Sequence, residues 1–223
     1  MTDTPSSPSP SPAADSLGAS RTIPLLRELA EQGELVAQLA LGHLYDEGIA
    51  VGKDEAEALH YYRMAAEQGD AQGQYLLGAS LSAGDDADEA GEAAAEAEAF
   101  GWMLKSARQG YAEAMHEVAH HYEWGDGVQE DKAEAVAWLR KAAEAGHADS
   151  MLELGKRYAE GDGVAKDKAE ARRWQAMAVE HGSTRAKLAQ LQKGTWRIML
   201  PFVSRIALLI LLLIAFKVVM RLL

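Results

Sequence analysis

The chain contains no cysteine, and only one of its six prolines lies beyond residue 24. The absence of cysteine excludes a disulfide framework, a cysteine-ligated zinc site and a cysteine nucleophile. The N terminus also lacks a basic segment followed by an apolar core, so no secretory signal is predicted. Residues 1–24 are rich in proline and serine and hold too few apolar side chains to offset the entropy of ordering, which predicts a disordered tail.

Basic residues are scarce in the body of the chain. Residues 25–192 contain 16 Lys and Arg against 32 Asp and Glu, whereas residues 193–223 contain five basic residues and no acidic one. Nucleic-acid binding depends on clustered lysine and arginine, which displace counterions from phosphates. The acidic body therefore argues against a nucleic-acid partner and is typical of a soluble helical surface.

A ladder of glycines runs through the body of the chain. Gly33, Gly69, Gly110, Gly146 and Gly182 are spaced 36, 41, 36 and 36 residues apart, and each ends a phrase such as AAEQG or AAEAG. A fixed period in the thirties is typical of a solenoid built from copies of one supersecondary unit.

Each copy is predicted to be a pair of helices. The first helix ends at a turn that contains glycine, which can adopt the positive φ of a helix end. The second helix begins at Asp54, Asp131 or Asp167, and each aspartate is followed three residues later by glutamate, as in a capping box. An aspartate at this position accepts free backbone N–H groups and suits the positive end of the helix dipole. These three aspartates are therefore predicted to be structural caps.

Other residue types recur at fixed positions of the pair. Small residues on the first helix predict close contacts between helices, and aromatic residues on the second helix predict a core shared by neighbouring repeats. The small residues are Gly42, Gly78, Ala119 and Gly155, and the aromatic residues are Tyr61, Trp102, Trp138 and Trp174.

These positions together resemble the Sel-one-like repeat, a 36-residue relative of the tetratricopeptide repeat. The shared marks are a Leu-Gly step, a tyrosine, a GDGV turn at 125–128 and 161–164, the capping aspartate, and then Ala, Trp, Ala-Ala and Gly. The resemblance covers residues 25–192. It implies an all-α, right-handed superhelix of antiparallel helix pairs that assembles protein complexes.

The predicted organisation follows the ladder. The solenoid at 25–192 is flanked by the tail at 1–24 and by a juxtamembrane and membrane segment at 193–223. Within the solenoid, the second repeat carries an acidic insertion at 83–98, interpreted as a partly helical loop that either serves a function or is neutral. The solenoid divides into a leading half-repeat at 25–34, repeats at about 35–70, 71–111, 112–147 and 148–183, and a trailing helix at 184–192.

The end of the chain is apolar on all sides. Residues 206–216 contain no polar side chain, and their nine large apolar residues favour insertion by roughly 4–5 kcal/mol. Residues 206–223 would rise about 27 Å as a helix, close to the hydrocarbon thickness of a bilayer. We therefore expect a single-pass tail anchor within 199–223, with the repeats in the cytoplasm. The alternative is a hydrophobic C-terminal helix that docks in a partner or an oligomer.

The third repeat contains the motif HExxH at 116–120. On a helix this motif places His116 and His120 on one face, as in zinc proteases. The repeat register argues against a protease, because these positions correspond to ordinary positions of the first helix in other repeats. No third ligand is identifiable, and the strands that accompany such sites have no candidates here.

The sequence therefore predicts a membrane-tethered interaction scaffold without a cofactor or a catalytic residue. A zinc-dependent hydrolase that uses the HExxH is the alternative, and a membrane-bound structural subunit is a third possibility. The partner would be a protein or peptide in a groove along the first helices. The polar residues expected to face this groove are His43, Asp46, His120, Glu123 and Lys156.

Overall fold

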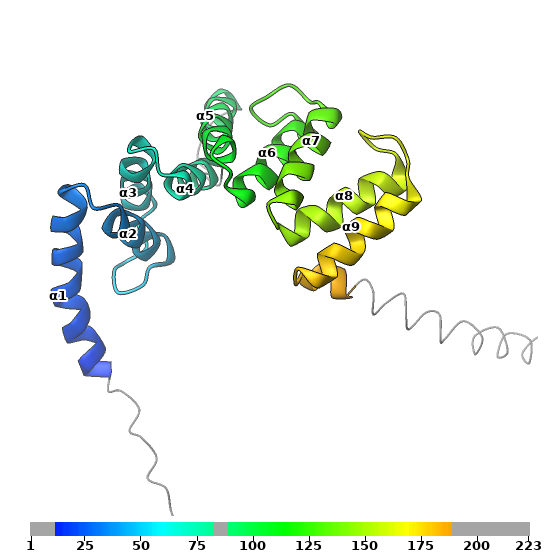
Figure 1. The fold of residues 1–223 in the computed structure, drawn as a ribbon. Coiled ribbons are helices and arrows are strands. Elements are labelled where there is room, and N and C mark those ends of the chain that lie inside the picture. The colour runs from blue at the N-terminus through cyan, green and yellow to red at the C-terminus, as the bar shows by residue number, and fades with distance from the viewer. Residues whose placement is uncertain (1–11, 83–88, 189–223) are drawn as a thin grey trace, which may run out of the picture. The chain divides into compact units, whose positions relative to one another are not determined.

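A computed structural model describes residues 12–82 and 89–188, which form helices and the turns between them (Figure 1). The chain divides into two compact units, Met1–Ala145 and Gly146–Leu223. In the first unit, α2 packs on α3, α4 on α5 and α6 on α7, and in the second α8 packs on α9. The helices are α1 (Pro12–Glu31), α2 (Leu35–Glu47), α3 (Glu55–Glu67), α4 (Ala71–Ser82), α5 (Glu89–Arg108), α6 (Ala112–Trp124), α7 (Lys132–Glu144), α8 (Ala148–Glu160) and α9 (Lys168–Glu180).

Glycines end the first helices of the pairs, as the glycine-containing turns predict. Gly48, Gly125 and Gly161 follow α2, α6 and α8 with φ of 68°, 80° and 83°. Each donates its N–H to the carbonyl four residues earlier, which satisfies an acceptor at the helix end. The ladder glycines after the second helices also have positive φ, between 89° and 98°. The period of the sequence is therefore the period of left-handed helix ends.

The three aspartates cap the second helices by one half of a capping box. The Asp54 side chain accepts from the N–H of Glu57, and Asp131 and Asp167 each accept from two N–H groups. The reciprocal half, from the glutamate to the aspartate N–H, is replaced. That N–H donates instead to a tyrosine carbonyl in the preceding helix, as from Asp54 to Tyr45 at 2.9 Å. The cap thus also closes the turn between the paired helices.

Close helix contacts occur where small residues recur. A Cβ on Gly42 would lie 2.3 Å from Cε1 of Tyr62, and a Cβ on Gly78 would lie 2.7 Å from Cγ of Met103. In the second unit, a Cβ on Gly155 would lie 3.0 Å from the carbonyl oxygen of Ala171. The paired helices approach closely because these positions have no side chain.

Buried glutamines join neighbouring repeats in the first unit. The Gln38 side chain donates to the carbonyl eight residues earlier at 2.9 Å and accepts from Gln68 at 2.7 Å. Gln74 repeats this arrangement at the same register and accepts from Gln109 at 2.8 Å. These pairs satisfy polar groups that burial would otherwise penalise. These pairs were not predicted from the sequence.

The N-terminal part differs from the expected boundary at residue 24. The helix α1 begins at Pro12 and includes Pro24, so residues 12–31 form one element. The serine- and proline-rich run ends at Pro12, which is tolerated in the first turn of a helix. The following residues include Ala13, Ala14 and Leu17, which favour a helix. Residues 1–11 lie outside the described part.

The second repeat accommodates its extra residues in a long helix. The second helices α3, α7 and α9 have 13 residues each, whereas α5 has 20 and begins at Glu89. Much of the predicted insertion at 83–98 is therefore the first part of α5, and residues 83–88 lie outside the described part. The segment 89–99 is rich in alanine and glutamate, which are strong helix formers.

The C-terminal part is described as far as residue 188. Residues 184–188 are helical, in agreement with the start of the predicted trailing helix. Among the described residues, no helix is long and apolar enough to cross a membrane. The predicted anchor at 199–223 lies outside the described residues.

Candidate functional site

An open cavity of about 400 Å³ lies in the first unit, between α4, α5 and α6. Tyr75 and Ala79 come from α4, Glu96 and Met103 from α5, and Glu117 from α6. The helices α4 and α5 are the pair of the second repeat, and α6 is the first helix of the third repeat. The cavity therefore lies where two repeats meet.

Aromatic residues from two different helices, Tyr75 of α4 and Trp124 of α6, line this cavity. Trp124, the last residue of α6, is 63% exposed, and its ring stacks on His120 with centroids 4.9 Å apart. Burial raises the pKa of Tyr75, and the Glu117 carboxylate raises it further. The Tyr75 phenol is therefore a protonated hydrogen-bond donor at neutral pH.

The charged groups that line the cavity are acidic. The carboxylates of Glu96, Glu117 and Asp126 all line it, and within the described part of the chain no lysine or arginine does so. A cation would interact favourably with both the carboxylates and the faces of the aromatic rings. The chemistry of the walls suits a basic side chain.

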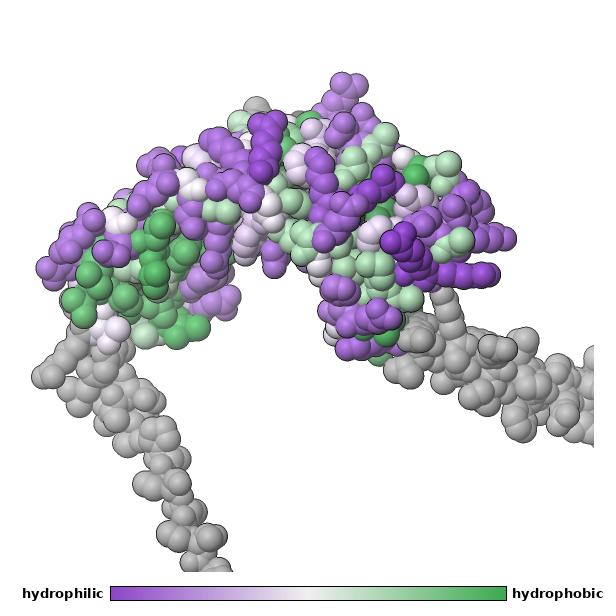
Figure 2. Space-filling view, viewed as in Figure 1, coloured by the Kyte–Doolittle hydropathy of each residue, from purple (hydrophilic) through white to green (hydrophobic). Residues whose placement is uncertain are grey.

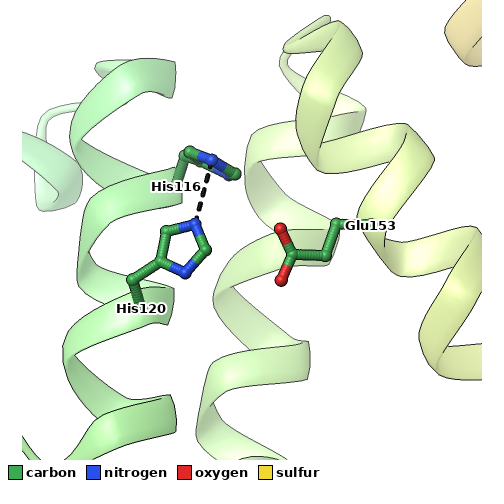
Figure 3. A group of neighbouring side chains, drawn as sticks. All are labelled: His116, His120 and Glu153. Atoms are coloured by element: carbon green, nitrogen blue, oxygen red, sulfur yellow. Dashed lines mark hydrogen bonds between the residues drawn. The ribbon is translucent and has the colours of Figure 1, made fainter. Parts of the chain in front are cut away.

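Two histidines of α6 face each other on one side of the helix (Figure 3). The Nε2 atoms of His116 and His120 are 3.1 Å apart, and the two rings are nearly perpendicular. Nδ1 of His120 lies 3.6 Å from a carboxylate oxygen of Glu123. Glu153, also drawn in Figure 3, belongs to α8 in the second unit, where it pairs with Arg157 at 3.3 Å. The HExxH motif thus brings its histidines together as helical spacing requires.

The five residues predicted to face a partner groove lie in different surroundings. His120 and Glu123 are adjacent on α6, and His120 also lines the cavity. His43 is exposed, with Nδ1 3.2 Å from the Tyr62 hydroxyl. Asp46 lines a different pocket, between α2, α3 and α4. The remaining residue, Lys156, is exposed on α8 in the second unit.

One register on the first helices holds structural polar residues that were not predicted from the sequence. His121, buried in α6, interacts through Nδ1 with the carbonyl oxygen of Asp126 at 2.7 Å. In the second unit, Arg157 occupies the same register and pairs with Asp162 and Glu153. The shared five-residue spacing to the turn aspartate was the signal that could have identified both.

Hydrophobic side chains also reach the surface at the N-terminal end of the first unit. Figure 2 shows them over α1 to α3, where Leu25, Val36 and Ile49 are each more than half exposed. Polar side chains cover much of the remaining visible surface (Figure 2). This end of the solenoid therefore differs in character from the acidic cavity at α4 to α6.

The glycine-ended helix pairs, capped by aspartate and repeated in register, define an all-α helical-repeat solenoid. The chain belongs to the Sel1 repeat family, which it matches at residues 35–70, 71–111, 112–147 and 148–183. Four successive copies of a protein-interaction repeat therefore make up most of the described chain.

Similar solved structures share this fold. One is c5321, a protective antigen of uropathogenic Escherichia coli, with a TM-score of 0.67 and 36% identity over 78% of this chain and 36% of the other. A Sel1 repeat protein from Oxalobacter formigenes has a TM-score of 0.67 and 28% identity over 79% of this chain and 73% of the other.

A curated relative is the chitin synthase regulator SKT5 of Saccharomyces cerevisiae. It is 32% identical over 111 residues, which are 47% of this chain. The chain spans about 15% of the length of that relative. The likeness therefore concerns the repeats and leaves most of the yeast protein uncovered.

Proposed function

We propose that the chain is a scaffold that binds a partner protein through a basic segment seated in the cavity between α4, α5 and α6. The observation that carries this proposal is the pairing of exposed Trp124 with the carboxylates of Glu96, Glu117 and Asp126. A lysine or arginine side chain could lie against the ring while its charge meets the acidic wall. The yeast relative, named as a regulator of chitin synthase, also fits a role exerted through another protein.

The proposal includes a membrane tether. A helix over 206–223, which contains the apolar run at 206–216, would rise about 27 Å, close to the hydrocarbon thickness of a bilayer, and the basic residues before it favour a cytoplasmic repeat body. The expected right-handed superhelix would then present its cavity to partners beside the bilayer. Holding a weakly bound partner at one surface raises its effective concentration.

We further propose that the chain is not an enzyme. The HExxH motif lies within α6, an ordinary first helix of a repeat, and its Glu117 lines the proposed partner cavity. In zinc hydrolases the corresponding glutamate activates a metal-bound water. The motif is accounted for here by a partner-binding surface and a pair of histidines.

A peptide array tests the partner chemistry. The full-length protein in detergent is incubated with peptides of graded lysine and arginine content, and binding of the best peptides is then measured in solution. We expect basic peptides to bind, and Trp124→Ala or Glu117→Gln to weaken binding at least tenfold. Added salt should weaken it as well, because the carboxylates are partly exposed.

Two control variants separate the cavity from the general surface. Glu113→Gln removes an exposed charge from the same helix outside the cavity, and Val36→Ala trims an exposed apolar side chain elsewhere. Both should bind basic peptides normally. A preference for acidic peptides, or equal binding by all four variants, would contradict the proposal.

A further inference from the structure

We infer that α6 binds one divalent first-row transition metal ion through Nε2 of His116 and Nε2 of His120. This inference concerns a ligand of different chemistry from the basic partner segment and does not depend on the proposed function. The two residues come from one helix, so the site needs no contribution from another part of the chain to bring its protein ligands together.

The distance between the two nitrogens suits a shared metal ion. Bonds from zinc to histidine nitrogen are about 2.0–2.1 Å long, so two nitrogens 3.1 Å apart would subtend roughly 100° at the metal. That angle lies between the square-planar and tetrahedral values. Imidazole ligands suit zinc, copper and nickel, and water would occupy the remaining positions.

A neighbouring carboxylate favours the tautomer of His120 that a metal ion at Nε2 requires. A carboxylate oxygen of Glu123 lies 3.6 Å from Nδ1, the nitrogen that would not bind the metal. Metal-ligating histidines commonly interact with a carboxylate through their second nitrogen, which fixes the tautomer and raises the basicity of the ligand. At 3.6 Å the Glu123 carboxylate is too far away for a hydrogen bond, but its charge favours a proton on Nδ1 and so leaves the Nε2 lone pair for the metal.

The repeat architecture does not require this pair of histidines. At the register of His116 the other repeats hold large apolar or aromatic residues, and at the register of His120 only one of them holds histidine. The pair is therefore specific to the third repeat. The corresponding residues are Leu39, Tyr75 and Leu152 at the first position, and His43, Ala79 and Lys156 at the second.

A hydrogen bond between the two rings is the competing explanation of the distance. One Nε2 would then donate a proton and the other would accept it. In that state the donating nitrogen has no lone pair for a metal, so the two explanations are exclusive at any moment. They differ in whether added metal displaces the shared proton.

Calorimetric titration of the full-length protein with Zn²⁺ and with Ni²⁺ separates them. The protein is purified in detergent without a polyhistidine tag, because a tag would bind the same ions. We expect one ion per chain. His116→Leu and His120→Ala should each weaken binding at least tenfold, and both replacements are residues that other repeats carry at these positions.

His60→Ala is the matched control, because it removes an exposed histidine from α3 that has no histidine four residues away. It should bind the metal as the unchanged protein does, and circular dichroism should show all variants to be helical. Absence of binding, retained affinity in either single variant, or an equal loss in His60→Ala would overturn the inference. His116 does not line the cavity, so His116→Leu should still bind basic peptides. A failed metal site and a failed partner site are thereby distinguishable.

Discussion

At the scale of single residues, Tyr62 makes the free energy of unfolding depend on pH. Its side chain is fully buried, and burial raises its pKa well above the ordinary range, with a further increase from the carboxylates of Asp46 and Glu47. In the unfolded chain a tyrosine ionises near pH 10. Above that pH the unfolded state releases a proton that the folded state keeps, so the free energy of unfolding falls as pH rises.

Tyr62→Phe is the variant that measures this effect. Below pH 9 it should be less stable than the unchanged protein by about 1 kcal/mol, because it lacks the contact between the Tyr62 hydroxyl and Nδ1 of His43. Urea unfolding between pH 8 and pH 11 should show this difference shrinking by about 1 kcal/mol, since each pH unit above the ordinary pKa corresponds to roughly 1.4 kcal/mol. Other tyrosines are common to both proteins and do not affect the difference. A difference that stays constant with pH would contradict the assignment.

At the scale of helices, the packing of α4 on α5 depends on the absence of a side chain at Gly78. A Cβ there would lie 2.7 Å from Cγ of Met103 and 3.0 Å from the carbonyl oxygen of Ala99, and the second atom belongs to the backbone. Gly78→Ala should therefore lower the free energy of unfolding by about 1–3 kcal/mol, as measured by urea unfolding.

Gly101→Ala is the control for the change in helix propensity. Gly101 lies within α5. Apart from its chain neighbours and the nearby backbone of its own helix, no atom lies within 4 Å of the Cβ that alanine would add. This variant should be more stable by about 0.5–1 kcal/mol, because alanine loses less conformational entropy in a helix. If both variants changed stability in the same direction, steric contact at Gly78 would not be the cause.

Much of the helix arrangement was predictable because its signals are local. The left-handed ends at Gly48, Gly125 and Gly161 and the aspartate caps each depend on a few neighbouring residues. The length of α5 was harder to predict, because the alanine- and glutamate-rich insertion favours a helix by propensity while its place between two helices suggests a loop. The glutamine pair of Gln38 and Gln68 spans 30 residues, and no local pattern marks such a contact.

At the scale of the molecule, the candidate sites were only partly predictable. The pairing of His116 and His120 follows from helical spacing alone. The cavity depends on how α4, α5 and α6 pack. Trp124 and Glu96 therefore line the same cavity only in the folded unit. The predicted groove residues His43 and Asp46 share a register with cavity residues but lie in different local surroundings. Register therefore identifies equivalent positions and does not by itself predict equivalent roles.

The tether is also a property of the whole chain, and it can be tested by substitution as well as by truncation. The apolar run at 206–216 favours insertion by roughly 4–5 kcal/mol, whereas each arginine at its centre would replace a gain of about 0.5 with a cost of about 2.5–3.5 kcal/mol. The double variant Leu209→Arg with Leu212→Arg should therefore lose more than the entire gain.

Carbonate extraction of cell membranes should leave the unchanged protein in the pellet and release both this variant and a chain that ends at residue 192. The matched control is Leu209→Ile with Leu212→Ile, which keeps the run apolar and should remain in the pellet. Retention of the arginine variant in the pellet would mean that the repeat body or a bound partner, rather than a helix within 199–223, holds the protein at the membrane.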